Sequence, residues 1–196
     1  MKSFEQVMEF TRTISGATAF EEEECKRYWE LLHQIPEGSN ILEIGLQFGR
    51  SSSIAIQVGM ERGLKLIGVD DWSQPPEARE EWMGMVGMLG ALAGRDYAML
   101  ATKSQKLQRW LLGRREWLRL HLTLVDGDHH YHAALADLKM ADWHTVHGGY
   151  VCVHDYGRES LPEVYRAVEE WQRAEGANWK QLGSHGTLGV WMNMGW

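Results

Sequence analysis

A buried strand, a glycine turn and the start of a helix follow one another in Ile41-Leu42-Glu43-Ile44-Gly45-Leu46-Gln47-Phe48-Gly49-Arg50-Ser51. The apolar residues before the turn are typical of a strand inside an α/β sheet. Gly45 and Gly49 let the backbone pass close to a ligand, and the first amides of the following helix point into the same space. We therefore expect a cofactor to bind at this turn.

The turn lacks the glycine spacing of a dinucleotide site. A G-x-G-x-x-G fingerprint would need glycine where the chain has Gln47 and Arg50. The negative charge of Glu43, just before the turn, would repel a phosphate and attract a cationic amino acid group. A cofactor without phosphates therefore fits better. A nicotinamide-dependent oxidoreductase on the same kind of sheet is the alternative, and the glycine pattern counts against it.

Strands and helices alternate along the rest of the chain, which predicts a parallel, right-handed α/β sheet. The expected strands are 40–45, 65–70, 97–102, 119–125 and 149–154, and the expected helices are 50–62, 76–93, 104–113, 131–143 and 161–174. Two short runs, 179–182 and 188–192, predict a C-terminal antiparallel hairpin. Asp70 ends the second strand, where an acid can accept both hydroxyls of a ribose.

The N-terminal part has helical periodicity over 3–15 and 19–34, so we expect a helical extension, 1–38, before a main domain, 39–196. The acidic run from Glu21 to Glu24 is interpreted as a solvated helix face at a favourable helix start. Asp137 is likewise expected to be solvated on the helix over 131–143.

Composition limits the classes of partner. The chain has 196 residues, a net charge of −7 and two cysteines. The charge argues against nucleic acid or an anionic membrane as partner. No apolar segment is long enough to span a membrane, the start does not resemble a signal peptide, and the few cysteines favour a reducing, cytoplasmic setting. The ten tryptophans serve either the core or a subunit contact, so a homo-oligomer stays open.

Ionisable side chains follow two further strands. One run is Leu124-Val125-Asp126-Gly127-Asp128-His129-His130-Tyr131, and the other is Tyr150-Val151-Cys152-Val153-His154-Asp155-Tyr156. Because ligands bind at the carboxyl ends of parallel strands, these two ends would present carboxylates and imidazoles to one crevice.

These motifs together resemble a known family. The chain is similar to class I S-adenosylmethionine-dependent methyltransferases, in the branch related to macrolide-sugar and cephalosporin-pathway O-methyltransferases and, more distantly, to catechol-type enzymes. The resemblance covers about 40–194. Its motifs are E-I-G-L-Q-F-G-R-S at 43–51, V-D at 69–70, D-G-D-H-H-Y at 126–131 and H-G-G-Y-V-C-V-H-D-Y at 147–156.

The resemblance implies a Rossmann-like sheet of seven strands with S-adenosylmethionine across the strand ends. Glu43 and Gly45 would lie near the methionine portion, Asp70 on the ribose and Ser104 in the adenine pocket. The implied cofactor-binding residues are Glu43, Gly45, Gly49, Ser51, Asp70, Ser104 and Asp126.

Transfer to a hydroxyl needs a metal ion or a general base. By resemblance Asp126 and Asp155 match metal-binding positions, and Asp128 would support them directly or through water. Mg²⁺ prefers oxygen ligands, whereas the imidazole of His154 suits Zn²⁺, Mn²⁺ or Fe²⁺ better. The expected metal ligands are Asp126, Asp155 and His154, and a metal-free reaction stays open.

His129 stands where catechol-type enzymes carry their catalytic lysine, so His129 is the expected base and Asp126 its catalytic partner. Alternatively, His129 bonds to a backbone turn or orients Asp155. The sequence thus predicts an S-adenosylmethionine-dependent O-methyltransferase that acts on a small-molecule hydroxyl. A non-catalytic cofactor-binding domain is the remaining alternative.

Overall fold

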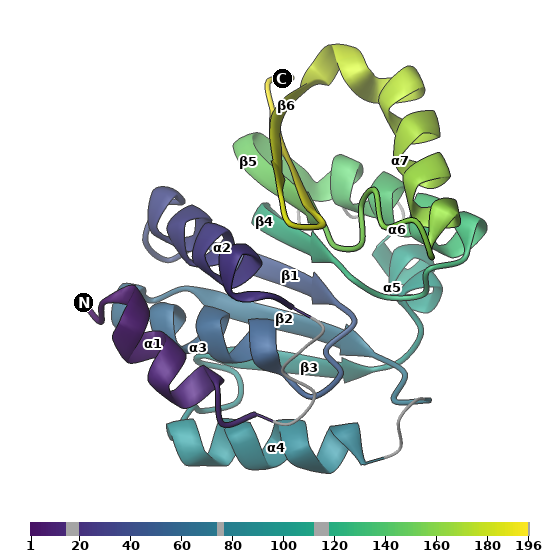
Figure 1. Ribbon diagram of the computed structural model, residues 1–196. Helices are drawn as coiled ribbons and strands as arrows, with labels where there is room; N and C mark the ends of the chain where they lie inside the picture. Colours follow the sequence, from purple (N-terminus) through teal and green to yellow (C-terminus); the bar gives the residue numbers. More distant parts are fainter. Residues whose placement is uncertain (15–19, 74–76, 112–117, 196) are drawn as a thin grey trace.

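A seven-stranded sheet with helices on both faces makes up the structure, a computed structural model that describes residues 1–14, 20–73, 77–111 and 118–195 (Figure 1). The strand order is β3-β2-β1-β4-β5-β7-β6. The strands are β1 (Asn40–Ile44), β2 (Lys65–Asp70), β3 (Tyr97–Ala101), β4 (Leu120–Val125), β5 (Thr145–Val153), β6 (Trp179–His185) and β7 (Leu188–Asn193). β1 to β5 pair in parallel, whereas β7 runs antiparallel to β5 and β6. The predicted Rossmann-like fold with a C-terminal hairpin is confirmed.

Two hydrophobic cores lie on the two faces of the sheet. The helices on the first face are α1 (Phe4–Thr11), α2 (Glu22–Gln34), α3 (Arg50–Arg62) and α4 (Ala78–Leu89). The helices on the second face are α5 (Ser104–Leu111), α6 (Tyr131–His144) and α7 (Pro162–Glu175), which leads into the short 3-10 helix η2 (Gly176–Asn178). Figure 1 shows the two groups on opposite sides of the strands. No helix in the described ranges is long and apolar enough to cross a membrane.

The N-terminal helices share the first core with the strands. Met8 of α1 and Tyr28 and Leu31 of α2 are fully buried there beside Ile41 of β1. A buried hydrogen bond of 2.8 Å joins the hydroxyls of Thr11 and Ser53. The division at residue 38 stays a prediction, but the segment before it contributes directly to the core.

The hairpin adds an inner strand as well as an edge strand. β7 lies between β5 and β6, and the turn between β6 and β7 is at Gly186 and Thr187. β6 is longer than the sequence predicts, because the predicted linker 183–186 continues its pairing as far as His185. The turn therefore comes close to the end of β5.

Backbone hydrogen bonds join the carboxyl ends of the central strands beyond the strands themselves. The Asp126 amide donates to the Ile44 carbonyl at 2.8 Å, and the His154 amide donates to the Val125 carbonyl at 3.0 Å. The loops after β1, β4 and β5 are thus held side by side, and they carry the residues that the sequence singles out.

Candidate active site

The glycine turn after β1 borders a pocket. The pocket is lined by Phe20, the turn from Gly45 to Ser51, and Asp126. Gly45 and Gly49 have φ angles of 86° and 91°, which favour glycine. A Cβ on Gly49 would lie 2.7 Å from atoms of both Trp82 and Met85 on α4. Packing of the chain on itself therefore requires this glycine, whatever ligand the pocket holds.

Asp70 holds the glycine turn in shape. Its Oδ2 accepts hydrogen bonds from the amides of Leu46 at 2.8 Å and Gln47 at 3.1 Å, and its Oδ1 accepts one from the amide of Trp72 at 2.7 Å. A carboxylate offers about four lone-pair sites, so these bonds leave room for one more donor. Contact of Asp70 with a ribose stays a prediction.

Glu43 points into the protein. Its carboxyl is fully buried and accepts hydrogen bonds from the hydroxyls of Ser51 and, at 2.8 Å, Ser52. Burial raises the pKa of Glu43 to about 8, so the group carries a proton at neutral pH. The expected attraction of a cationic cofactor group by a negative Glu43 therefore has no support at neutral pH. Cofactor contacts of Glu43 and Ser51 stay predictions.

Ser104 begins α5, and its side chain bonds to Asp137 of α6. The expectation that Asp137 is solvated is wrong, because Asp137 is buried on the inner face of α6 with Ala134, Leu138 and Ala141. Burial raises the pKa of Asp137 to about 7. The hydroxyl of Ser104 thus supports a buried carboxyl, and its place in an adenine pocket stays a prediction.

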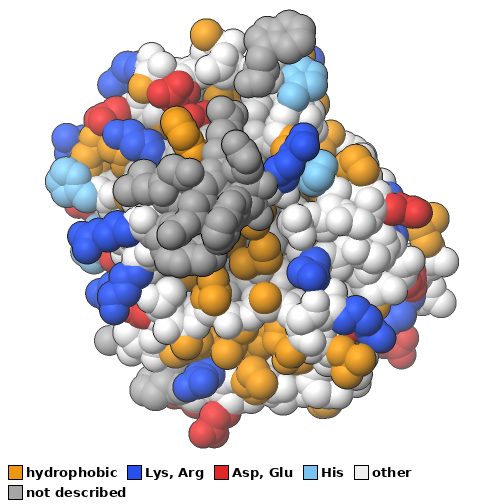
Figure 2. All heavy atoms as spheres, turned by 180° about the vertical axis from the view of Figure 1, so that it is seen from behind, with side chains coloured by type: hydrophobic (Ala, Val, Ile, Leu, Met, Phe, Trp, Pro, Cys, Tyr) orange, Lys and Arg blue, Asp and Glu red, His pale blue; other side chains and the backbone are white. Residues whose placement is uncertain are grey.

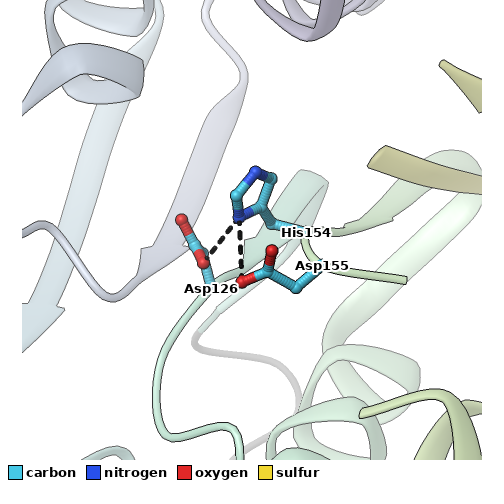
Figure 3. A group of neighbouring side chains, drawn as sticks. All are labelled: Asp126, His154 and Asp155. Carbon is cyan, nitrogen blue, oxygen red and sulfur yellow. Dashed lines mark hydrogen bonds and ion pairs between the residues drawn. The ribbon is translucent and has the colours of Figure 1, made fainter. Parts of the chain in front are cut away.

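Two carboxylates and an imidazole meet beside the pocket (Figure 3). Nδ1 of His154 lies 3.0 Å from Oδ1 of Asp126 and 3.5 Å from Oδ2 of Asp155. Two ligands about 2.1 Å from one metal ion are about 3.0 to 3.5 Å apart at octahedral or tetrahedral angles. In the described part of the chain these three side chains form a group with metal-ligand spacing. The residues therefore fit a divalent cation.

His129 faces the same carboxylates. Its Nε2 lies 3.1 Å from Oδ2 of Asp155 and 3.6 Å from Oδ1 of Asp126, without an aligned hydrogen bond to either. These two carboxylates raise the pKa of His129 to about 9. The side chain of His129 is 38% exposed, whereas its Nε2 is buried against the two carboxylates. Asp128 bonds instead to exposed His130, at 2.5 Å from its ring.

The family match decides the identity of the fold and its activity. Residues 42–156 match a family described as a methyltransferase domain. The chain belongs to this methyltransferase family. Its fold is that of the class I enzymes that use S-adenosylmethionine, and the match favours methyl transfer over the nicotinamide-dependent alternative.

Solved structures of methyltransferases have the same fold. CalS11, a TDP-rhamnose 3'-O-methyltransferase of calicheamicin biosynthesis, is 12% identical with a TM-score of 0.66, over 98% of this chain and 93% of CalS11. An O-methyltransferase from Bacillus cereus in complex with SAH is 14% identical with a TM-score of 0.65, over 98% and 90%. An rRNA methylase from Streptococcus thermophilus is 12% identical with a TM-score of 0.64, over 89% and 98%. At these identities the likeness shows the fold alone. No curated protein matches the chain.

The methyltransferase holds Asp155 in an unusual backbone conformation. Asp155 has a φ of 58°, and its Oδ1 accepts a hydrogen bond of 2.8 Å from Arg158. Although burial opposes the charged carboxylate, the nearby side chains of His129, His154 and Arg158 hold the pKa of Asp155 well below its usual range. Arg158 therefore fixes one carboxylate oxygen and leaves Oδ2 toward the cluster.

One further residue belongs to this site and was not expected from the sequence. Glu24 of α2 was assigned to a solvated face, but it is fully buried, and its Oε2 lies 3.3 Å from Nε2 of His154. Burial disfavours the charged imidazole, yet Asp126, Asp155 and Glu24 raise the pKa of His154 to about 12. The signal was present in the spacing, since Glu24, Tyr28 and Leu31 lie on one helical face.

Proposed function

We propose that the methyltransferase transfers a methyl group to a hydroxyl of a small molecule, with a divalent cation at Asp126, His154 and Asp155. The supporting observation is the position of Asp126. This residue lines the pocket at the glycine turn and also belongs to the cluster with metal-ligand spacing. A methyl donor in the pocket and an acceptor at the cluster would therefore meet at Asp126.

S-adenosylmethionine supplies an electrophilic methyl carbon on a sulfonium, which leaves as the neutral thioether S-adenosylhomocysteine. A hydroxyl oxygen must lose its proton as it takes that methyl group. Asp126, His154 and Asp155 would hold the cation, which would supply Lewis acidity and so lower the pKa of a hydroxyl bound to it. The chain's own contribution is to hold donor and acceptor at adjacent strand ends and to take up the proton.

His129 is the residue proposed to receive that proton. Its Nε2 faces the cluster, and the ring reaches the surface of the site. The neutral imidazole is the form that accepts a proton. Asp126 and Asp155 favour the charged form of His129, and this influence weakens when their negative charge is shared with a cation.

The donor set favours a cation of borderline character. One imidazole nitrogen and two carboxylate oxygens suit Zn²⁺, Mn²⁺ or Fe²⁺ better than Mg²⁺, which prefers oxygen alone. Binding there also requires the Nδ1 lone pair of His154, because metals bind the neutral imidazole.

A small-molecule acceptor fits the charge of the chain better than RNA. The net charge of −7 opposes contact with a phosphate backbone. CalS11 and the Bacillus cereus enzyme are named as O-methyltransferases, which supports oxygen as the accepting atom. Cys25 and Cys152 are buried and form no disulfide, which is in keeping with a cytoplasmic setting. A homo-oligomer stays a prediction.

The proposal is tested by cofactor binding, cation binding and methyl transfer in the same samples. Calorimetry measures binding of S-adenosylhomocysteine, NAD and Mn²⁺, and radiolabelled S-adenosylmethionine measures transfer to a panel of sugar and phenolic hydroxyls. We expect binding of S-adenosylhomocysteine without NAD, and transfer that a chelator abolishes.

Substitutions locate the activity. Asp126→Asn and Asp155→Asn should each lower Mn²⁺ affinity and transfer at least about 100-fold. Glu159→Gln removes an exposed carboxylate from the same loop and should change neither. Unchanged Mn²⁺ affinity and transfer in both aspartate variants would overturn the role of the cluster. Binding of S-adenosylhomocysteine by a wild type that transfers no methyl group to any hydroxyl of the panel would favour a domain that only binds the cofactor.

A further inference from the structure

Glu24 joins three segments that are far apart in the sequence. It belongs to α2, it lies against the end of β5 through His154, and it accepts hydrogen bonds from the turn between β6 and β7. Its Oε1 accepts from the amide of Thr187 at 2.7 Å and from the hydroxyl of Thr187 at 2.8 Å. Its Oε2 accepts from the amide of Glu21 at 2.7 Å and lies 3.3 Å from Nε2 of His154. Each carboxylate oxygen of Glu24 therefore has two hydrogen-bond partners.

The surrounding chain is shaped to hold this carboxylate. Gly186 has a φ of 58°, and a Cβ there would lie 2.8 Å from Oε1 of Glu24. The ring of Phe20 covers His154, with ring centroids 5.2 Å apart. A carboxylate buried this deeply costs several kcal/mol unless donors surround it. Neutral apolar residues would fill the same space at a lower cost in free energy. Packing alone therefore does not explain why a charged group is buried here.

The orientation of His154 supplies that explanation. An ionised Glu24 can only accept a hydrogen bond, so Nε2 of His154 must carry the hydrogen that points to it. With Nε2–H committed to Glu24, Nδ1 is the ring nitrogen directed at Asp126 and Asp155 (Figure 3). A histidine that binds a metal through one nitrogen usually donates its other N–H to a carboxylate or a carbonyl.

We propose that Glu24 is a positioning residue of the cation site, which holds Nε2–H of His154 and so directs Nδ1 toward the place where a divalent cation would displace its hydrogen. This inference rests on the proposed function, because it assumes a cation at Asp126, His154 and Asp155. It adds that α2, outside the segment 42–156 that matches the family, is a working part of the site.

Glu24→Gln is the informative substitution because it keeps the size of the side chain. Its amide oxygen can still accept from Thr187, while its NH₂ group can donate to Nε2 of His154. That bond would leave the hydrogen on Nδ1, where it blocks a metal. Glu23→Gln on the same helix is the control, since Glu23 is 67% exposed and makes no contact with His154.

Calorimetry with Zn²⁺ measures the effect on the wild type, Glu24→Gln and Glu23→Gln, and S-adenosylhomocysteine binding by the same samples shows that each is folded. Glu24→Gln should weaken Zn²⁺ binding about 10- to 100-fold, and Glu23→Gln should not. Nitrogen NMR of the Zn²⁺-loaded wild type should show the metal on Nδ1 and the hydrogen on Nε2 of His154.

A double-mutant cycle separates positioning from a general loss of structure. In the background His154→Asn, the substitution Glu24→Gln should cause no further loss of Zn²⁺ affinity, because the residue through which Glu24 acts is gone. Equal further loss in both backgrounds would overturn the proposal, as would wild-type Zn²⁺ affinity in Glu24→Gln.

The outcomes also separate this inference from the proposed function. If the wild type binds Zn²⁺ and Glu24→Gln binds it equally well, the cation site stands and the role of Glu24 is wrong. If the wild type binds neither Zn²⁺ nor Mn²⁺ at millimolar concentration, the cation site fails and the role of Glu24 fails with it. Methyl transfer by that metal-free protein would then be measured separately.

Discussion

Gly45 packs so closely on the backbone of Asp126 that no side chain fits between them. A Cβ on Gly45 would lie 2.0 Å from the carbonyl oxygen of Asp126, and the amide of Asp126 is bonded to the carbonyl of Ile44. The turn that borders the pocket is therefore packed directly on the backbone of Asp126, a residue of the proposed cation site. A side chain at position 45 would therefore displace the backbone of Asp126.

Gly45→Ala should lower the free energy of unfolding by about 2–5 kcal/mol, since it combines a φ of 86° with a backbone collision. The control is Gly84→Ala on α4, where a Cβ meets nothing within 4 Å. That substitution should be stabilising by about 0.5–1 kcal/mol, because alanine favours a helix. Urea unfolding measures both, and a Gly45→Ala protein as stable as the wild type would contradict the packing described here.

Glu43→Gln should change how stability depends on pH. Below pH 4.5 both folded and unfolded chains hold the proton of Glu43, and between pH 4.5 and about 8 the folded chain alone holds it. The contribution of Glu43 to the free energy of unfolding of the wild type therefore falls by about 1.4 kcal/mol per pH unit through this range, and it levels off above pH 8. Glutamine cannot ionise, so the stability of the variant relative to the wild type should increase as pH rises.

Urea unfolding at pH 5, 6.5 and 8 tests this expectation, with Glu9→Gln as the control for loss of one exposed carboxyl. A difference between Glu43→Gln and the wild type that is constant over pH would show that the buried carboxyl does not hold its proton. Binding of S-adenosylhomocysteine by the same variant shows whether Glu43 also contacts the cofactor.

His129→Gln separates the two roles open to His129. If His129 takes the acceptor's proton, kcat should fall about 10²- to 10⁴-fold while Mn²⁺ and S-adenosylhomocysteine bind normally. If His129 only orients Asp155, cation affinity should fall together with kcat. His130→Gln removes an exposed neighbouring imidazole and should leave kcat within a few-fold of the wild type. Full activity in His129→Gln would exclude both roles.

Ser104→Ala tests whether Ser104 serves the fold or the cofactor. Removing the hydroxyl deprives buried Asp137 of the hydrogen bond from Ser104, which should cost about 1–3 kcal/mol of stability. If Ser104 also lines the adenine pocket, affinity for S-adenosylhomocysteine should fall in the same variant. Thermal unfolding measures the loss, and unchanged thermal stability would show that the bond to Asp137 contributes little. Asp137→Asn, which removes the ionisable group at the other end of the bond, is the companion variant.

Local patterns in the sequence predicted the sheet and the centre of the site. Apolar runs that end in glycine or acid predicted the strands, because burial and turn geometry depend on neighbouring residues. Since parallel strands end at one edge, the spacing also brought Asp126, His154 and Asp155 together, and the structure places these three side chains within metal-ligand distances.

The directions of individual charged side chains were predicted wrongly, although the spacing of Glu24, Tyr28 and Leu31 on one helical face indicated the burial of Glu24. Glu24 lies in an acidic run and Asp137 in a mostly apolar helix, yet both face inward with apolar neighbours. Glu43 lies within β1, just before the turn that borders the pocket, yet its carboxyl accepts hydrogen bonds from Ser51 and Ser52 inside the protein. Each error comes from treating an ionisable side chain as charged and exposed, although a buried carboxyl is tolerated where donors surround it or where it keeps its proton.

The sequence by itself determined the alternation of strands and helices, the glycine turn and the two acidic strand ends, since each depends on residues close together in the chain. The tertiary structure alone decided that Glu24 lies against His154, 130 residues away. That contact depends on how α2 packs across the sheet and how the hairpin turn at Thr187 closes over it. Such packing is a property of the whole core, so no local pattern records it.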